Sequence, residues 1–145
     1  MKIEEYYQGF SEEQVKKYRD EVRQRWGEKT LEESEQRVLK MGKTKFHEVQ
    51  TEGGVIFQAI SDNMDKGFDS DFIQAQVGKW REWLENFHHY SIEAVAGLGG
   101  EYSRNPQFGA FFDKYDKDLA PFLTKAIEYY CAREKQLKPG SGRPA

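Results

Sequence analysis

The chain is poor in the residues from which disulfide frameworks, membrane anchors and secretion signals are built. Its 145 residues include one cysteine and four prolines. The lone Cys131 cannot form an intramolecular disulfide, and a single thiol is compatible with a reducing compartment. No apolar run approaches the roughly 18–20 residues of a membrane span. The acidic, aromatic N-terminus also lacks the apolar core of a signal peptide. Together these absences predict a cytoplasmic protein with no membrane segment.

Tracts of positive charge are missing as well. The net charge is −3 although 32% of the residues are charged, and no row of Lys and Arg is interleaved with aromatic residues. Affinity for nucleic acid comes largely from neutralising phosphates, so a binding protein needs such a basic footprint. We therefore expect no direct nucleic-acid binding by this chain.

Sequence motifs for metal, phosphate or nucleophilic chemistry are absent too. His88 and His89 are adjacent, so on a helix they would point about 100° apart and could not share a metal ion. The run from Gly97 to Gly100 lacks the preceding strand and the lysine of a phosphate loop. Ser91 has no evident carboxylate to orient a catalytic base. The sequence thus predicts no catalytic residue, no metal site and no cofactor.

Strand patterns are almost absent, and segments with a 3.6-residue apolar period dominate, which predicts an all-α protein. Ser11 is a plausible N-cap for a first helix that ends at Gly27. A second, mostly polar helix is expected to open near Thr30. A third is expected over about 44–65, and Gly67 then breaks the chain.

The C-terminal third is expected to contain shorter helical pieces. Asn105-Pro106 marks a turn, and a short aromatic segment follows over 108–115. The last helix begins near Asp116 or Asp118, with Pro121 in its first turn, where a missing N–H costs little. Residues 138–145 are predicted to be a flexible tail.

Aromatic side chains, in contrast, are abundant, with 10 Phe, 8 Tyr and 3 Trp. They concentrate between Trp80 and Tyr102. This segment belongs to a fourth helix that is expected to begin after a cap at Asp69 or Ser70 and to continue to Tyr102, with Gly97, Gly99 and Gly100 loosening its last part. Aromatic stripes at helical spacing most often form core. This chain has more rings with polar edges than its core needs, so we expect some of them to line a ligand cavity. We interpret this segment as part of a binding site.

Three sets of motifs, taken in order, resemble a known family. They are Glu21-Val22-Arg23-Gln24-Arg25-Trp26-Gly27, preceded by Gly9-Phe10; Gly97-Leu98-Gly99 with Glu101-Tyr102, Asn105-Pro106-Gln107-Phe108 and Phe112-Asp113; and Asp118-Leu119-Ala120-Pro121-Phe122-Leu123 with Ala126-Ile127 and Tyr129-Tyr130. Their order and spacing are similar to the TipA-S antibiotic-recognition domain, the effector-binding domain of some MerR-type transcriptional activators. The resemblance covers about residues 9–134.

This resemblance implies a single globin-like, all-α domain without haem, here over 1–137. It implies recognition of bulky hydrophobic antibiotics such as thiopeptides in an aromatic cleft. It also implies N-terminal helices, here over 11–40, that are mobile until a ligand binds. The upstream DNA-binding segment and coiled coil of MerR-type proteins are not in this sequence, and stand-alone drug-sequestering members also occur. Tyr90 stands where the thiopeptide-binding member has a reactive cysteine, so we expect non-covalent binding.

We therefore predict a ligand-binding module for multi-ring hydrophobic compounds, either a regulator's effector domain or a stand-alone drug-sequestering protein. The residues predicted to contact the ligand are Trp80, Trp83, Phe87, His88, Tyr90, Ser91, Tyr102, Tyr18 and Trp26. Two alternatives remain open from the sequence: a small enzyme that uses His88 or His89 as a general base, and a helical protein-interaction domain. The oligomeric state is also open, a monomer being one option without the upstream coiled coil.

Overall fold

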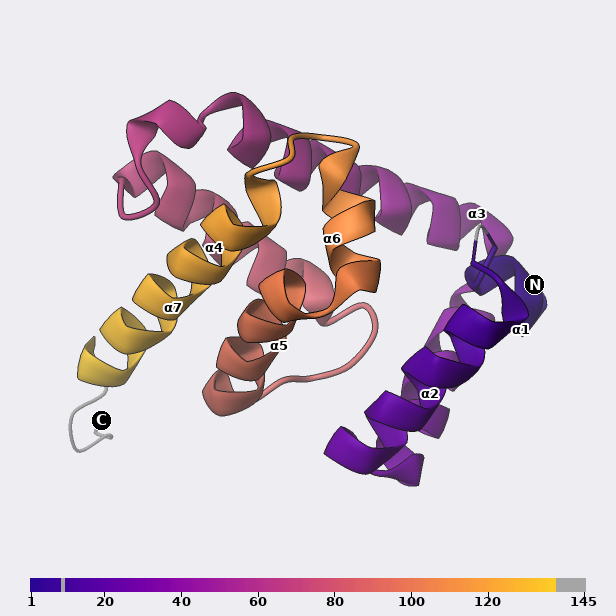
Figure 1. Ribbon diagram of the computed structural model, residues 1–145. Helices are drawn as coiled ribbons and strands as arrows, with labels where there is room; N and C mark the ends of the chain where they lie inside the picture. Colours follow the sequence, from indigo (N-terminus) through magenta and orange to yellow (C-terminus); the bar gives the residue numbers. More distant parts are fainter. Residues whose placement is uncertain (9, 138–145) are drawn as a thin grey trace. The chain divides into compact units, whose positions relative to one another are not determined.

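The computed structural model describes residues 1–8 and 10–137, and in this part of the chain every regular element is a helix (Figure 1). The all-α prediction is therefore confirmed for these residues. Gly9 and the predicted flexible tail 138–145 lie outside the described residues. Among the described helices, none combines the length and the hydropathy required to traverse a bilayer. The helices in chain order are α1 (Ile3–Tyr6), α2 (Glu12–Trp26), α3 (Glu28–Asp62), the 3-10 turn η1 (Met64–Lys66), α4 (Asp71–Leu84), α5 (Ile92–Arg104), α6 (Pro106–Asp113) and α7 (Leu119–Leu137).

The ends of α2 follow the predicted capping signals. The Ser11 hydroxyl accepts a hydrogen bond from the Gln14 N–H at 3.1 Å, and the Gln14 side chain accepts one from the Ser11 N–H at 2.9 Å. This reciprocal pair satisfies backbone donors that a helix start otherwise leaves unpaired. At the other end, Gly27 has a φ of 95°, a conformation that residues with a side chain rarely adopt. The predicted first helix is thus confirmed, while the short α1 before it was not predicted.

The second and third predicted helices are joined in α3, which is interrupted at Gly42. Gly42 has φ 79° and ψ 168°, so the chain kinks there between two helical stretches. The stretch before Gly42 starts at Glu28, earlier than the predicted Thr30. The stretch after it ends at Asp62 rather than at 65, and η1 follows. Gly42 therefore separates two helical stretches, just before the predicted start of the third helix at about 44.

The fourth predicted helix starts where expected, since the Ser70 hydroxyl accepts from the Ile73 N–H at 3.3 Å at the start of α4. The prediction that this helix continues to Tyr102 is wrong. The helix α4 ends at Leu84, and α5 begins at Ile92 after a connecting segment over 85–91. At the end of α4, the side-chain amide of Asn86 donates to the Trp83 carbonyl at 2.8 Å and so competes with helical hydrogen bonding.

Two further contacts fix this connecting segment. The Arg37 guanidinium donates to the Glu85 carbonyl at 2.7 Å, which satisfies an acceptor at the end of the helix. The Ser91 hydroxyl accepts from the Ala94 N–H at 3.1 Å and caps the start of α5. Consequently Phe87, His88 and Tyr90 lie in the connection and do not share a helical face.

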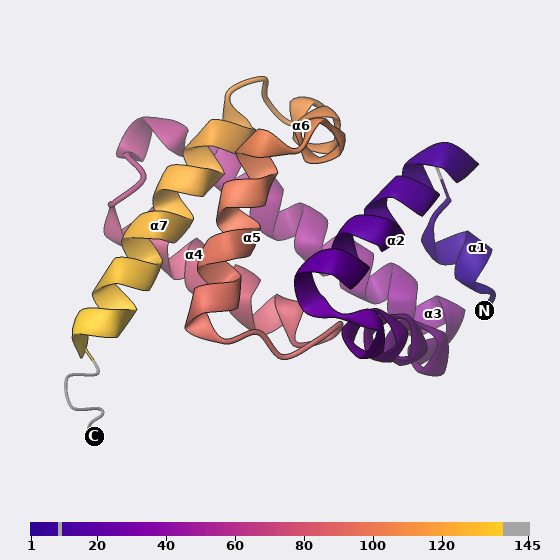
Figure 2. The ribbon, with the colours of Figure 1, turned by 60° about the horizontal axis from the view of Figure 1, so that its bottom comes forward.

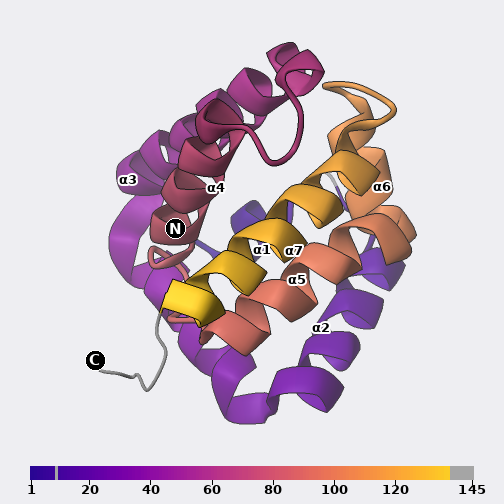
Figure 3. The same cartoon turned by 90° about the vertical axis from the view of Figure 1, so that its left-hand side faces the viewer.

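The chain is divided into two compact units. Of the described residues, the first contains 1–8, 10–52 and Trp83–His89, and the second contains Gly53–Glu82 and 90–137. In the second unit, α5 and α7 lie side by side (Figures 2 and 3). The glycines of α5 that were expected to loosen it lie inside a regular helix, and Gly99 is buried where α5 meets Ile127 of α7.

Candidate functional site

The structure distributes the predicted ligand-binding residues over both units. The first unit contains Tyr18, Trp26, Trp83, Phe87 and His88, and the second contains Trp80, Tyr90, Ser91 and Tyr102. Within each unit some of them contact one another, and each set is described separately below.

Rings from several helices meet in the first unit, and we call this set the first-unit ring cluster: Tyr6, Tyr7, Tyr18, Phe46, Trp83 and Phe87. Trp83 and Phe87 pack edge to face with their ring centroids 5.1 Å apart. The Tyr6 ring contacts both Phe87 and Phe46, with ring centroids 6.5 Å and 5.5 Å apart, respectively. Edge-to-face pairs at these separations are favourable because the positive edge of one ring meets the negative face of the other. The cluster thus joins the residues after α4 to α1 and α3.

Most of the cluster is only partly buried. Phe46 is 4% exposed, whereas Trp83, Phe87 and the three tyrosines are of intermediate exposure. The Trp83 indole donates to the Val49 carbonyl at 2.8 Å, which fixes the ring against α3. Such rings hold their orientation and still keep accessible surface, which is the combination that a site for a flat apolar compound requires.

Beside these rings lies a buried carboxylate that the sequence analysis did not single out. Glu35 is 9% exposed, and it accepts a hydrogen bond from the Tyr7 hydroxyl at 2.6 Å. Arg19 Nη2 donates to the same carboxylate at 3.0 Å, and Arg19 Nε lies 3.0 Å from its other oxygen. Burial and the neighbouring Glu35 hold the pKa of Tyr7 well above its ordinary value. Tyr7 therefore stays protonated and links α1 to α3 as a donor.

The predicted residues of the second unit have structural roles. Trp80 and Tyr102 are 2% and 5% exposed. The Trp80 Nε1–H donates to the Tyr102 hydroxyl at 3.1 Å, and Tyr102 also packs against Phe108 and Phe112. Burial raises the pKa of Tyr102, so its hydroxyl remains neutral in the core. Ligand contact by these residues stays a prediction.

The remaining predicted positions of the second unit are less enclosed. Tyr90 is partly buried, and desolvation raises the pKa of its phenol, which therefore remains protonated and poorly nucleophilic at neutral pH. Ser91 uses its hydroxyl to cap α5. Neither side chain is arranged as an activated nucleophile.

The histidines that the sequence offered as a general base lie in the segment between α4 and α5. His89 Nδ1 lies 2.9 Å from a carboxylate oxygen of Glu85, and the His89 side chain is 74% exposed. An exposed pair of this kind is typical of a surface and not of a base held in a pocket. In the described part of the chain, no cluster of His, Cys, Asp and Glu side chains is arranged to hold a metal ion.

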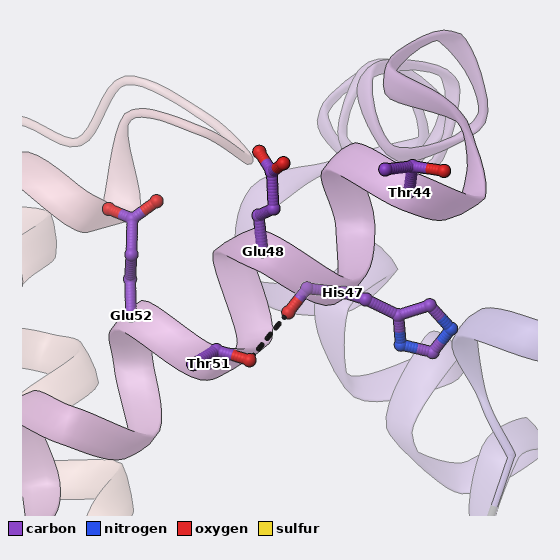
Figure 4. Close-up of a pocket in the computed structure, with 5 residues that line it drawn as sticks. All are labelled: Thr44, His47, Glu48, Thr51 and Glu52. Atoms are coloured by element: carbon purple, nitrogen blue, oxygen red, sulfur yellow. Dashed lines mark hydrogen bonds between the residues drawn. The ribbon is translucent and has the colours of Figure 1, made fainter.

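A depression on the surface of the first unit follows one side of α3. It is lined by Thr44, His47, Glu48, Thr51 and Glu52, all of them exposed (Figure 4). The Thr51 hydroxyl donates to the His47 carbonyl at 3.0 Å and so stays within its own helix. The depression is open and lined by one helix, so it would enclose little of a bulky ligand, and we do not assign the ligand to it.

Several residues of the first unit's interior were missed by sequence reasoning. Tyr6 and Tyr7 precede the first predicted helix, and only their aromatic character could have drawn attention to them. Glu35 carried a clearer signal. It lies on the same helical face as Leu31 and Val38, which are 2% and 1% exposed. A charged residue within an apolar stripe predicts a buried partner.

Comparison with known proteins shows the family of this chain. The sequence profile of the TipAS antibiotic-recognition domain matches residues 18–130. The HTH-type transcriptional activator mta of Bacillus subtilis (strain 168) is 31% identical over 129 residues, which are 88% of this chain and 50% of that protein. The chain therefore spans about half the length of this relative. No solved structure gives a significant match. As its motifs predicted, the chain belongs to the TipAS antibiotic-recognition domain family.

Proposed function

We propose that this chain binds bulky hydrophobic multi-ring compounds non-covalently, thiopeptides or other antibiotics being the class to test first. The first-unit ring cluster carries the proposal because it presents half-buried rings held in fixed orientations. Membership of an antibiotic-recognition family supports it independently. Partly exposed rings provide apolar area and stacking at a small entropic cost.

The residues proposed to contact ligand are those predicted from the sequence. Trp83, Phe87 and Tyr18 belong to the ring cluster and have the strongest structural support. In the whole protein, such a domain would serve as the effector domain of a transcriptional regulator or would sequester drug by itself. The relative mta, named a transcriptional activator, is about twice as long as this chain. A role in regulating transcription or in sequestering drug is therefore part of the proposal.

A thermal-shift screen against thiopeptides and other hydrophobic antibiotics tests the proposed function. A ligand present at 100 times its dissociation constant should raise the free energy of unfolding by about 2.7 kcal/mol. A small polar compound at the same concentration is the matched control and should give no shift. If no hydrophobic compound stabilises the fold, the ring cluster is packing alone, and a protein-interaction role becomes the better explanation.

Binding is expected to leave no covalent adduct. Tyr90 is a protonated phenol, and the only thiol, Cys131, is buried with its Sγ 3.8 Å from the Ile92 carbonyl oxygen. Desolvation also raises the pKa of Cys131, which reduces its reactive thiolate fraction. Intact mass spectrometry after incubation with a thiopeptide provides the check. A mass increase that survives denaturation would locate a nucleophile that these residues do not predict.

We further propose that residues 11–40 act as a lid and exchange amide hydrogens faster than residues 44–134 in the free protein. The structure describes the whole of α2, and none of its residues is buried. Helices with few buried apolar contacts open locally at low free energy. Hydrogen exchange followed by mass spectrometry, without and with ligand, measures the difference, and ligand should slow exchange in 11–40. Uniform protection from Ser11 onward would contradict the lid proposal.

A further inference from the structure

The two tyrosines of α1 pack on residues that are proposed to contact ligand. The Tyr6 ring lies tilted against Phe87, with the ring centroids 6.5 Å apart. The Tyr7 ring packs edge to face with Tyr18, and these centroids are 6.2 Å apart. Both contacts lie within the first unit. The helix α1 therefore covers part of the ring surface that the proposed ligand would need.

Tyr6 covers a second ring as well. It packs edge to face with Phe46 of α3, with the ring centroids 5.5 Å apart, and Phe46 is only 4% exposed. Phe87 has another ring neighbour, Trp83, whose indole is fixed to the Val49 carbonyl by a hydrogen bond of 2.8 Å. A compound that stacks on Phe87 must replace one of its two neighbours, and Trp83 is the one anchored in the longer helix α4.

Side-chain contacts, and not helical stability of its own, hold α1 in place. The helix has four residues, none of them buried, and so short a helix is not stable in isolation. The Tyr7 hydroxyl donates to Glu35 at 2.6 Å, and Glu5 forms a solvent-accessible ion pair with Lys43 at 3.6 Å. Ion pairs of the second kind contribute little to stability. Few groups therefore have to be exchanged for α1 to leave the ring cluster.

We propose that α1 is an autoinhibitory strap, whose Tyr6 ring holds the place that a ring of the ligand takes against Phe87 and Phe46. This inference rests on the proposed function and concerns how the same site is regulated. A ring of the ligand can replace the Tyr6 ring, because both offer a flat apolar face to the same neighbours. The apparent affinity is reduced according to the fraction of molecules in which the strap is in place. A compound therefore binds tightly only if it contacts these rings better than Tyr6 does.

Calorimetric titration with a thiopeptide compares the parent with Tyr6→Ala, Tyr7→Phe and Glu4→Ala, each checked for folding by circular dichroism. Tyr6→Ala should bind about threefold to tenfold more tightly, since a favourable ring contact no longer competes with the ligand. Tyr7→Phe removes the hydrogen bond to Glu35, loosens the strap and should also raise the affinity. Glu4 is an exposed residue of the same helix, so Glu4→Ala is the matched control and should bind like the parent.

Amide hydrogen exchange followed by NMR gives a second readout, which a purely structural role of Tyr6 would not change. The Tyr7 N–H donates to the Ile3 carbonyl, and the Gln8 N–H donates to the Glu5 carbonyl. In the parent, the thiopeptide should speed exchange at both amides, because displacing α1 breaks these bonds. Unchanged or slower exchange at both would mean that α1 stays on the rings when ligand binds, and the inference would fail.

The inference and the proposed function fail on different results. If the parent binds the thiopeptide and Tyr6→Ala binds it equally or more weakly, the inference fails and the proposed function stands. If Tyr6→Ala does not fold, equal or weaker binding by Tyr7→Phe overturns the inference in its place. Measurable binding by Tyr6→Ala alone would support both. If none of the four proteins binds, the proposed function in its thiopeptide form fails, and the inference fails with it.

Discussion

Replacing Phe87 with alanine is expected to weaken thiopeptide binding by tenfold or more in a protein that still folds. Phe87 lies in the connection between α4 and α5 and is only partly buried. It packs edge to face with Trp83 and lies tilted against Tyr6. Removing a ring from such a position forfeits less packing than removing a core ring, for which about 3–5 kcal/mol is typical. It does remove apolar area that a ligand would cover, and aromatic side chains dominate binding energy at interfaces.

Trp83→Ala should weaken binding in the same way, with a somewhat larger loss of stability. Its indole N–H bonds to the Val49 carbonyl, and this hydrogen bond is lost together with the ring. Leu123→Ala is the control, because Leu123 is 2% exposed in the second unit. It should lose about 2–5 kcal/mol of stability, while the folded fraction keeps its affinity.

Calorimetric titration of these variants, with folding checked by circular dichroism, separates binding from packing. Parent-like affinity in both Phe87→Ala and Trp83→Ala would show that the ring cluster is packing alone. An equal loss of affinity in Leu123→Ala would show that the measurement reports stability and not contact with the ligand.

The fold was predictable from sequence wherever its determinants are local. Ser11 with Gln14 begins α2, and Gly27 ends it with a positive φ. Gly42 separates the two helical stretches of α3, and Pro106 occupies the first turn of α6, where its missing N–H costs nothing. Each signal acts through a residue's own backbone preference or through a partner within one turn. No distant contact is needed to read it.

The break between α4 and α5 was not predictable in this way. The spacing of apolar and aromatic residues over 85–91 is compatible with a helix. The helix ends there because of contacts that this spacing does not reveal. The Glu85 carbonyl is taken by Arg37, which is 48 residues away in sequence. Asn86 is a local signal for a helix end, and Ser91 is a local signal for a helix start. Both were overlooked because the aromatic periodicity around them indicated one continuous helix.

The candidate site was only partly predictable for the same reason. Aromatic composition identified Trp83, Phe87 and Tyr18, and it could not reveal that Tyr6 connects to Phe87 across the first unit. The buried Gln74 amide donates to the Ala126 carbonyl of α7, a partner that the sequence of α4 does not display. That is a property of packing. Sequence indicated the kinds of side chain at the site, and the structure supplied their partners.

Gly99→Ala is expected to destabilise the second unit by about 1–3 kcal/mol, the usual cost of overpacking a core. A methyl group at this position would lie 2.6 Å from Ile127 Cγ2 and 2.9 Å from Ile127 Cβ. A β-branched side chain has few rotamers within a helix, so Ile127 cannot turn aside. Either α5 or α7 must move. This cost exceeds the gain of up to about 1 kcal/mol that alanine brings to a helix interior.

Gly100→Ala is the matched control, since the atoms nearest to its added methyl group belong to the Arg104 guanidinium, the far end of a flexible side chain that is 63% exposed. It should leave stability unchanged or raise it by up to about 1 kcal/mol. Thermal and urea unfolding of both variants, and of Gly99→Ala combined with Ile127→Ala, measure the effect. The double variant should lose less than the sum of the single losses, because removing the Ile127 branches makes room for the new methyl group. Equal stability of Gly99→Ala and Gly100→Ala would mean that the helices separate easily at this point, and that the close approach of α5 to α7 contributes little to the fold.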